Sequence, residues 1–376
     1  MRTTPAVAAL LALLCCAAAH SQSTADPERR ADSLLQQLTT EEKIDMLGGV
    51  NGFYTRAIPR LQIPQFRMAD GPMGVRNGGP ATAFAGGIAL AASWDPELAR
   101  RMGEELGRDA RAKGVHFLLG PAVNIYRAPF NGRNFEYFGE DPFLASRIAV
   151  GYINGVQSQH VSATIKHYMG NNSEFDRHNT DSVMDERTMR EIYLPAFEAA
   201  VKEAHVGAIM DSYNLVNGVH AAENAVINNE IAKGEWGFAG IIMSDWGATY
   251  NAVRSANGGL DLEMPSAEFM NRSNLLSAIS SGSVKMAAID DKVRRLLRLG
   301  ARMGWLDRPQ ADLTIPRFNQ QARQVALRSA LEGMVLLKNS NQLLPLSRDR
   351  IQSVLVVGPA AHPGVPVAGG SARVEP

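Results

Sequence analysis

The stretch GIIMSDWGA, from Gly240 to Ala248, ends an apolar run with a carboxylate and a tryptophan. The apolar run predicts a strand that is buried on both faces. Asp245 then has two interpretations. Ser and Asp are good helix N-caps, so the pair could begin a helix. Alternatively, Asp245 is a catalytic carboxylate at a strand end, and Trp246 provides an apolar platform beside it.

Strand and helix patterns alternate on both sides of this stretch, which predicts βα units and a parallel sheet. The helical patterns cover 93–114, 141–159, 185–204 and 290–303, with a kink expected at Pro195. Polar residues recur where the apolar runs end, in MADGP, LLGPAVN, IKH, MDSYN, MSDW and LDLEMP. A doubly wound sheet would use one or two strand ends for its ligand. We therefore predict an α/β fold, a (β/α)8 TIM-type barrel with its site on the carboxyl-terminal rim.

The composition excludes two classes of function. The chain has 376 residues, with 38 basic and 38 acidic side chains, so its formal net charge is zero. A neutral chain without long single-sign runs argues against a nucleic-acid binder and against electrostatic attachment to a membrane. Because 45% of the residues are hydrophobic, the chain can bury a large core.

The amino terminus has the pattern of a secretory signal. Arg2 precedes a short apolar run over 6–19, and small residues follow it, so we predict a signal peptide over 1–21 and an exported protein, periplasmic or extracellular. A lipoprotein would carry a small residue before its cysteine, whereas Leu14 precedes Cys15. Both cysteines lie in this segment, so the mature chain is expected to form no disulfide and to stay off the membrane.

The carboxyl-terminal part changes character. We expect the barrel over 26–310, a linker and helix over 311–345, and over 346–376 the start of a truncated second α/β domain. Ser353–Val357 has the pattern of a buried strand of that second domain, followed by a Gly-Pro turn. A single strand and a loop do not make a domain, so such a strand would need a partner.

Six motifs in order resemble the β-glucosidase branch of glycoside hydrolase family 3. They are DGPMGVR (70–76), GRNFEYFGEDP (132–142), KHY (166–168), DERTMREIYLPAF (185–197), MDSYNLVNG (210–218) and GIIMSDWGA (240–248). The resemblance implies a retaining exo-β-glycosidase, which needs one carboxylate as nucleophile and a second carboxyl group as acid. It makes Asp245 the nucleophile. It implies no cofactor and no metal ion.

The resemblance also implies a set of sugar-binding residues: Asp70, Arg76, Arg133, Lys166, His167, Met210, Tyr213, Trp246 and Ser371. Taken singly, many have an ordinary structural interpretation, such as Asp70 in a turn or Met210 as core. Adjacent residues of a regular strand face opposite sides, so Lys166 and His167 could reach one sugar only from an irregular strand end. Glu136 is expected to pair with a neighbouring cation.

The general acid and the exact substrate stay open at this stage. Asn171 stands where the N-acetylhexosaminidase branch carries the histidine of its acid–base pair, which argues against that chemistry. In the β-glucosidase branch the general acid comes from the second domain, and its counterpart is expected beyond Pro376. The expected partner is an oligosaccharide or β-glucoside. The alternatives are a β-xylosidase, or a carbohydrate-binding remnant without catalysis.

Overall fold

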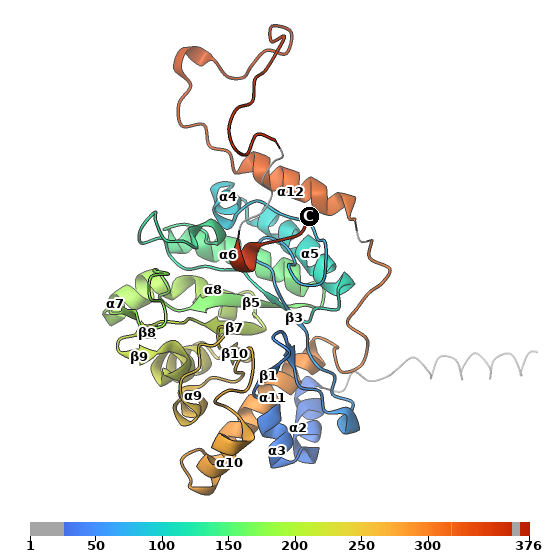
Figure 1. Ribbon diagram of the computed structural model, residues 1–376, viewed down its shortest axis with the longest axis vertical. Coiled ribbons are helices and arrows are strands. Elements are labelled where there is room, and N and C mark those ends of the chain that lie inside the picture. Colours follow the sequence, from blue (N-terminus) through green and yellow to red (C-terminus); the bar gives the residue numbers. More distant parts are fainter. Residues whose placement is uncertain (1–25, 317, 363–368) are drawn as a thin grey trace, which may run out of the picture.

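The computed structural model describes residues 26–316, 318–362 and 369–376, and the expected signal peptide lies outside these residues (Figure 1). A five-stranded parallel sheet with the order β10-β7-β5-β4-β3 forms its centre. The strands are β3 (Met68–Asp70), β4 (Phe117–Leu119), β5 (Ser162–Tyr168), β7 (Ala208–Asp211) and β10 (Ile241–Met243). Successive strands are parallel because a helix lies between each pair and returns the chain to the same end.

Single bridges close this sheet into a barrel. Met243 of β10 pairs in parallel with Leu262, and Glu263 pairs in parallel with Gly48. There β1 (Gly49–Val50) forms an antiparallel hairpin with β2 (Tyr54–Thr55), and Tyr54 pairs with Arg67, beside β3. The TIM-type barrel is confirmed, but its closing side is antiparallel. The connection from β1 to β2 is a tight turn, which leaves no room for the crossover helix that parallel strands need.

Helices surround the barrel (Figure 1). They are α2 (Pro27–Gln37), α3 (Thr40–Asp45), α4 (Gly87–Ala92), α5 (Pro96–Ala112), α6 (Pro142–Gln157), α7 (Glu186–Thr188), α8 (Pro195–Lys202), α9 (Ala252–Gly258), α10 (Arg272–Ser280), α11 (Met286–Arg302) and α12 (Gln320–Glu332). Two stretches are π-helical, Met189–Tyr193 and Val226–Glu235. The short strands β6 (Asp181–Ser182), β8 (Leu215–Val216) and β9 (Val219–His220) form a separate small sheet with the order β6-β8-β9. Among the described residues, no helix has the length and apolar character needed to cross a membrane.

The helix boundaries follow the sequence signals. Asp95 accepts hydrogen bonds from the backbone N–H groups of Glu97 and Leu98 and so caps α5. Asp141 caps α6 in the same way. Pro195 begins α8 after a π-helical stretch, which confirms the expected interruption, because proline cannot donate the hydrogen bond that a continuing helix requires.

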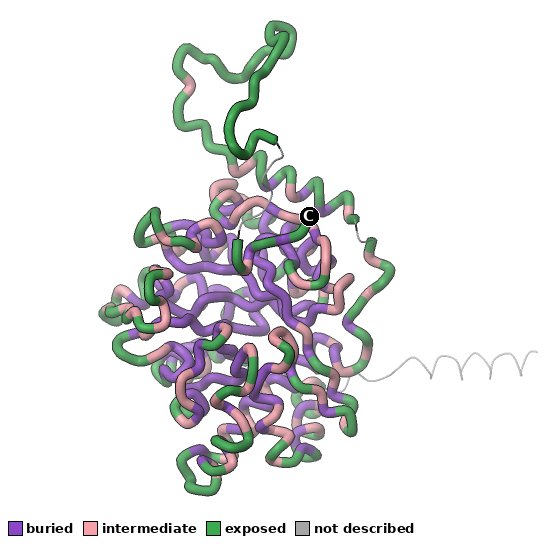
Figure 2. Tube along the Cα trace, in the orientation of Figure 1, coloured by how far each residue is buried: buried purple, intermediate pink, exposed green. Residues whose placement is uncertain are grey.

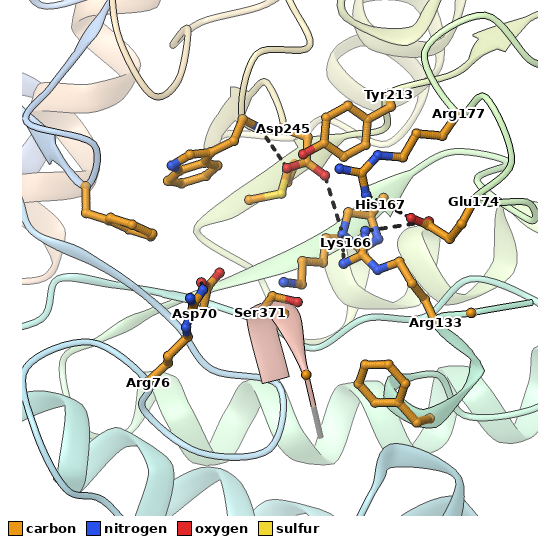
Figure 3. Close-up of a pocket in the computed structure, with 17 residues that line it drawn as sticks. Asp70, Arg76, Arg133, Lys166, His167, Glu174, Arg177, Tyr213, Asp245 and Ser371 are labelled. Atoms are coloured by element: carbon orange, nitrogen blue, oxygen red, sulfur yellow. Dashed lines mark hydrogen bonds and ion pairs between the residues drawn. The ribbon is translucent and has the colours of Figure 1, made fainter. Parts of the chain in front are cut away.

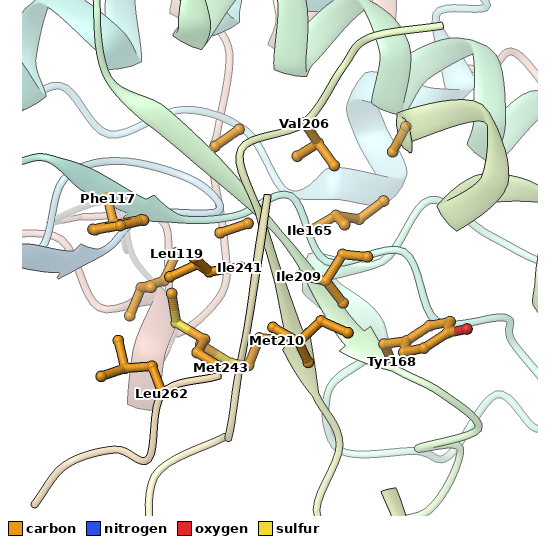
Figure 4. Packing of buried hydrophobic residues seen from close by; sticks show 14 of the residues in the cluster. Phe117, Leu119, Ile165, Tyr168, Val206, Ile209, Met210, Ile241, Met243 and Leu262 are labelled. Atoms are coloured by element: carbon orange, nitrogen blue, oxygen red, sulfur yellow. The ribbon is translucent and has the colours of Figure 1, made fainter. Parts of the chain in front are cut away.

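The strands supply the core. Figure 2 shows that the centre of the molecule is buried, and Figure 4 shows the apolar side chains of the strands packed together there. Phe117, Ile165, Ile209 and Ile241 have no exposed surface. Each such side chain contributes about 1.5–3 kcal/mol on burial, so the strands are held rigidly and their ends are fixed in space.

The expected strand over Ser353–Val357 does not form. This stretch has no regular structure and is exposed, with Leu355 87% accessible. It belongs to the long segment that follows α12, residues 333–362, which extends away from the barrel (Figure 1). The chain lies against the barrel again near its carboxyl end. The prediction of a buried strand was wrong, because no neighbouring strand among the described residues offers its backbone hydrogen bonds. The expected domain boundaries at 310 and 345 stay a prediction.

Candidate active site

A cavity of about 690 Å³ opens at the carboxyl-terminal ends of the strands. Asp70 ends β3, Met210 is the penultimate residue of β7, and Asp245 follows β10 by two residues. Figure 3 shows the labelled side chains converging on this space from separate elements. Every site residue expected from the sequence lines it: Asp70, Arg76, Arg133, Lys166, His167, Met210, Tyr213, Asp245, Trp246 and Ser371.

Asp245 is not a helix cap. The next helix, α9, begins at Ala252 and is capped by Asn251. Asp245 Oδ1 accepts a hydrogen bond of 2.7 Å from the backbone N–H of Trp246. Its Oδ2 is buried and has no hydrogen-bond partner among the described residues. The carboxylate is therefore held by one oxygen, while the other remains available at the cavity.

An aromatic wall stands beside this carboxylate. The Trp246 indole Nε1 donates to the carbonyl of Gly52 at 2.9 Å, which fixes the ring. Phe53 packs against it with a centroid distance of 5.1 Å and an interplanar angle of 39°. Both rings line the cavity. An apolar surface of this kind suits the face of a sugar ring, whose C–H groups are not hydrated strongly.

Tyr213 lies on another side of Asp245 (Figure 3). The guanidinium of Arg177 sits over its ring, 3.9 Å from the centroid. Burial and the negative charge of Asp245 raise the pKa of Tyr213. The phenol therefore keeps its proton and can donate it to an oxygen nearby.

Lys166 and His167 both reach the cavity although they are neighbours in β5. The pairing of β5 with β7 shifts register between Lys166 and Tyr168. This irregularity breaks the alternation of a regular strand, so the two side chains can share a side. The irregular strand end that their joint presence required is therefore found.

His167 is neutral. It is fully buried, and burial together with the charges of Arg133 and Lys166 lowers its pKa well below the usual value. Its Nε2 lies 2.8 Å from an Nη of Arg133 and 3.6 Å from Asp245 Oδ2. A guanidinium can only donate, so Nε2 must be the acceptor. The contact with Asp245 is therefore no ion pair.

A chain of alternating charges holds this side of the cavity. Arg133 Nε donates to Glu136 at 2.5 Å, and Arg133 Nη1 lies 3.9 Å from Glu174. Glu174 in turn accepts from Arg177 at 2.8 Å. Although burial opposes the charge of Arg133, the nearby carboxylates raise its pKa. Glu136 pairs with a cation as expected.

Asp70 and Arg76 form the opposite wall and are joined by a hydrogen bond of 2.8 Å (Figure 3). Burial raises the pKa of Asp70, while the positive charges of Lys166 and Arg76 counteract that shift. Ser371 closes the cavity from the short helical turn Gly370–Ala372. That turn belongs to the segment that returns to the barrel, so the site uses residues from both ends of the described chain.

The expected set of site residues leaves out several residues that the structure brings to this site. Phe53 and Phe135 line the cavity, and Asn124 lies behind His167 and bonds to it. Phe53 does not sit in a stretch with a functional signal, whereas Phe135 lies inside the motif GRNFEYFGEDP but was not singled out within it. Asn124 does end an apolar strand pattern, which is a signal that was available. No three His, Cys, Asp or Glu side chains in the described part of the chain gather so that they could hold a metal ion.

Comparisons with known proteins agree with this geometry. The model of the glycosyl hydrolase family 3 N terminal domain matches residues 37–299. A beta-glucosidase of Rhizobium radiobacter is 43% identical over 353 residues, which cover 91% of this chain and 42% of that protein. Beta-glucosidase B of Emericella nidulans is 41% identical, over 92% of this chain and 42% of its own length. The chain therefore spans less than half the length of these curated relatives.

Solved structures of beta-glucosidases are also similar to this chain. Beta-glucosidase 3B from Thermotoga neapolitana, in complex with alpha-D-glucose, matches with a TM-score of 0.80 and 35% identity, over 84% of this chain and 48% of that one. A family 3 beta-glucosidase from Bifidobacterium adolescentis matches with a TM-score of 0.79 and 38% identity, covering 83% of this chain and 46% of its own. From the barrel, the matched domain and these relatives together, the chain belongs to glycosyl hydrolase family 3.

Proposed function

We propose that this chain is the nucleophile-bearing barrel of an exported retaining β-glucosidase, which removes terminal non-reducing β-D-glucosyl residues. The observation that carries the proposal is the free, buried Oδ2 of Asp245 at a cavity rich in groups that bind hydroxyls. The relatives that bear the name beta-glucosidase support the choice of substrate. They are longer than this chain, so the activity of the whole protein is part of the proposal.

The proposed reaction has two displacements at one carbon. Asp245 Oδ2 attacks the anomeric carbon and forms an ester bond, while the bond from that carbon to the aglycone oxygen breaks. The aglycone oxygen takes a proton from a general acid. Water then attacks the same carbon, loses a proton to the conjugate base, and releases Asp245 as carboxylate. Two inversions leave the configuration of the sugar retained.

The polar walls would bind the sugar. Asp70 accepts hydrogen bonds from hydroxyl groups, and Arg76, Arg133 and Lys166 donate to them. Charged hydrogen bonds of this kind contribute about 1.5–3 kcal/mol each. Because Arg76 and Asp70 already hold each other at 2.8 Å, their geometry is set before the sugar arrives.

The general acid is a separate question. Apart from Asp245, the carboxylates that line the cavity are Asp70 and Glu174. Asp70 accepts a hydrogen bond from Arg76, and Glu174 accepts one from Arg177. Both carboxylates are already engaged by a guanidinium donor, which suits sugar binding better than proton donation. General acid catalysis contributes about 10²–10⁴-fold, so a leaving group that needs no proton should react best with these residues alone.

Location and partners complete the proposal. The charged and apolar order of residues 1–21 supports export to the periplasm or the extracellular space. The proposed partner is an oligosaccharide or a β-glucoside. The displacement uses a carboxylate nucleophile, so its chemistry requires neither a metal ion nor a cofactor.

The test is covalent labelling. The folded chain is incubated with a 2-deoxy-2-fluoro-β-glucoside that carries an activated aryl leaving group, and intact and peptide masses are measured. We expect one fluoroglucosyl adduct, on the peptide that contains Asp245. Asp245→Asn should abolish it, whereas the matched variant Asp349→Asn, at an exposed residue outside the cavity, should label normally.

Two other outcomes would change the conclusion. An adduct with the corresponding 2-fluoro-β-xyloside but not with the glucoside would make the protein a β-xylosidase. No adduct with either sugar, in protein shown to be folded, would contradict the role of Asp245 and favour a carbohydrate-binding chain without catalysis.

A further inference from the structure

Asn124 makes three hydrogen bonds to a single residue of the cavity. Its Nδ2 donates to the carbonyl of His167 at 2.8 Å. Its Oδ1 accepts from the backbone N–H of His167 at 2.9 Å and lies 3.1 Å from the ring Nδ1. Asn124 is 3% exposed, and the bridge between Ala122 and Lys166 holds its segment beside β5. No other residue bonds to both the backbone and the ring of His167 in the described chain.

These bonds determine which ring nitrogen of His167 carries the proton. The carbonyl of His167 can only accept, so the amide atom that faces it must be the Nδ2 donor. The other amide atom, facing the backbone N–H and the ring, must then be the Oδ1 acceptor. Nδ1 must consequently donate, which places the proton of the neutral ring on Nδ1.

The opposite side of the ring leads to the same conclusion independently. Arg133 donates to Nε2 at 2.8 Å, so Nε2 must carry a lone pair. The other charged groups that act on His167 are Lys166, Arg177 and Asp245, and the ring of Tyr137 packs edge-on against it at a centroid distance of 6.4 Å. The cations and the burial disfavour an imidazolium, so the two neutral tautomers are the states that compete.

We propose that Asn124 is a positioning residue that holds His167 in the Nδ1–H tautomer, so that Nε2 accepts from Arg133 instead of donating to Asp245. Asp245 Oδ2 lies only 3.6 Å from Nε2. In the other tautomer Nε2–H would face this oxygen and bind its lone pair, and Arg133 would lose its acceptor. The consequence for the nucleophile rests on the function proposed above, whereas the tautomer does not.

The tautomer can be measured directly on the full chain. The protein is labelled with 15N-histidine, and long-range proton–nitrogen spectra are recorded near neutral pH. The sequence has eight histidines, so His167→Gln identifies the signals of His167. We expect a protonated Nδ1 and an unprotonated Nε2 in the unchanged protein. A protonated Nε2, or a doubly protonated ring, would overturn the proposal.

Three variants separate positioning from simple stability. Asn124→Leu removes the acceptor, and we expect His167 to shift toward the Nε2–H tautomer. Asn124→Asp keeps an acceptor at Nδ1, so it should keep the tautomer, and its charge should raise the pKa of His167. Asn228→Leu is the matched control, because Asn228 is also a buried amide but bonds to Asp211 and Ala221 instead. It should leave the His167 signals unchanged.

The rate of labelling by the fluoroglucoside is the second readout. Asn124→Leu should slow the labelling of Asp245 by about tenfold, the effect of one lost buried hydrogen bond, and Asn228→Leu should stay within about twofold. Unchanged His167 signals in Asn124→Leu, or equal changes in Asn228→Leu, would overturn the proposal. If Asn124→Leu does not fold, Asn124→Asp decides, because loss of the Nδ1–H tautomer there would also overturn it. Failure of the unchanged chain to label would contradict only the proposed function.

Discussion

Two stretches of this chain consist entirely of apolar residues but differ completely in structure. Ile241–Met243 forms β10 and has no exposed surface. Val354–Val357 has no regular structure, and these four residues are 69–87% exposed. Hydrophobicity alone predicts a buried strand in both places. The difference therefore lies in what surrounds each stretch.

Every side of β10 has a partner. Ile241 donates to the carbonyl of Gly207, and Ile242 accepts from the N–H of Asp261 at 2.8 Å. The N–H of Ile242 donates to the Asp261 carboxylate, also at 2.8 Å. Helix α11 covers the outside. A buried strand forms where its backbone groups are hydrogen-bonded and both its faces are packed. An apolar run in the sequence indicates only that the faces can be packed, not that hydrogen-bond partners are present.

Substitution of one residue in each stretch by a charge is the strongest test of this contrast. Ile242→Asp would place an unpaired carboxylate in the core, and we expect it to lower the free energy of unfolding by more than about 4 kcal/mol or to prevent folding. Leu355→Asp, at an exposed site, should change it by less than about 0.5 kcal/mol. Urea unfolding followed by circular dichroism measures both.

The contrast between the two stretches depends on the result for Leu355→Asp. A loss of several kcal/mol there would mean that Val354–Val357 is packed in solution, and the contrast with β10 would fail. If Ile242→Asp yields no soluble protein, Ile242→Ala gives a milder version, with an expected loss of about 2–5 kcal/mol.

The same contrast explains how much the sequence could predict. Strand ends with polar residues, such as Asp70 and Asp245, predicted the rim of the barrel, because the order of local patterns determines a parallel fold. Helix caps such as Asp95 depend on the local sequence alone and are therefore predictable in the same way. The packing of Phe53 on Trp246 was not predicted, because its two rings come from distant segments whose sequences carry no sign of each other.

A second test compares a histidine in the barrel with a histidine in the exposed segment after α12. His116 lies in the barrel, where its Nδ1 accepts a hydrogen bond of 2.9 Å from the backbone N–H of Arg67 and its ring packs edge-on against Trp305. Burial and the charge of Arg67 lower the pKa of His116 to about 3. His362 lies in the segment that follows α12, residues 333–362, and is exposed. Acid should therefore affect the stability of the protein through His116.

The sign of this effect follows from proton binding. Below pH 6.5 the unfolded chain protonates His116, whereas the folded chain does not until about pH 3. The free energy of unfolding therefore falls as the pH drops from about 6.5 to 3, by on the order of 3 kcal/mol at pH 4. His116→Asn keeps an acceptor for Arg67 and removes the titration, so it should flatten this part of the pH profile, measured by urea unfolding at each pH. His362→Asn should leave the profile as it is, and equal profiles for both variants would refute the assignment.

The smallest expected effect compares two valines on the carboxyl-terminal side of α12. Val356 is exposed, whereas Val374 is buried where the chain returns to the barrel, and the neighbouring Glu375 accepts a hydrogen bond of 2.8 Å from the Ala81 N–H. A Cβ on Gly74 would lie 2.7 Å from Val374 Cγ2, so the fit there is close.

Val374→Ala should therefore weaken this docking by about 1 kcal/mol, through the loss of two buried methyl groups. Because the Ala81 N–H is protected by Glu375, its hydrogen exchange should become about fivefold faster in Val374→Ala and stay unchanged in Val356→Ala. Equal exchange in both variants would mean that Val374 does not hold the segment in place. Faster exchange in Val374→Ala alone would show that a stretch beyond α12 becomes ordered where the barrel offers it a partner, and that Ser371 reaches the cavity by this docking.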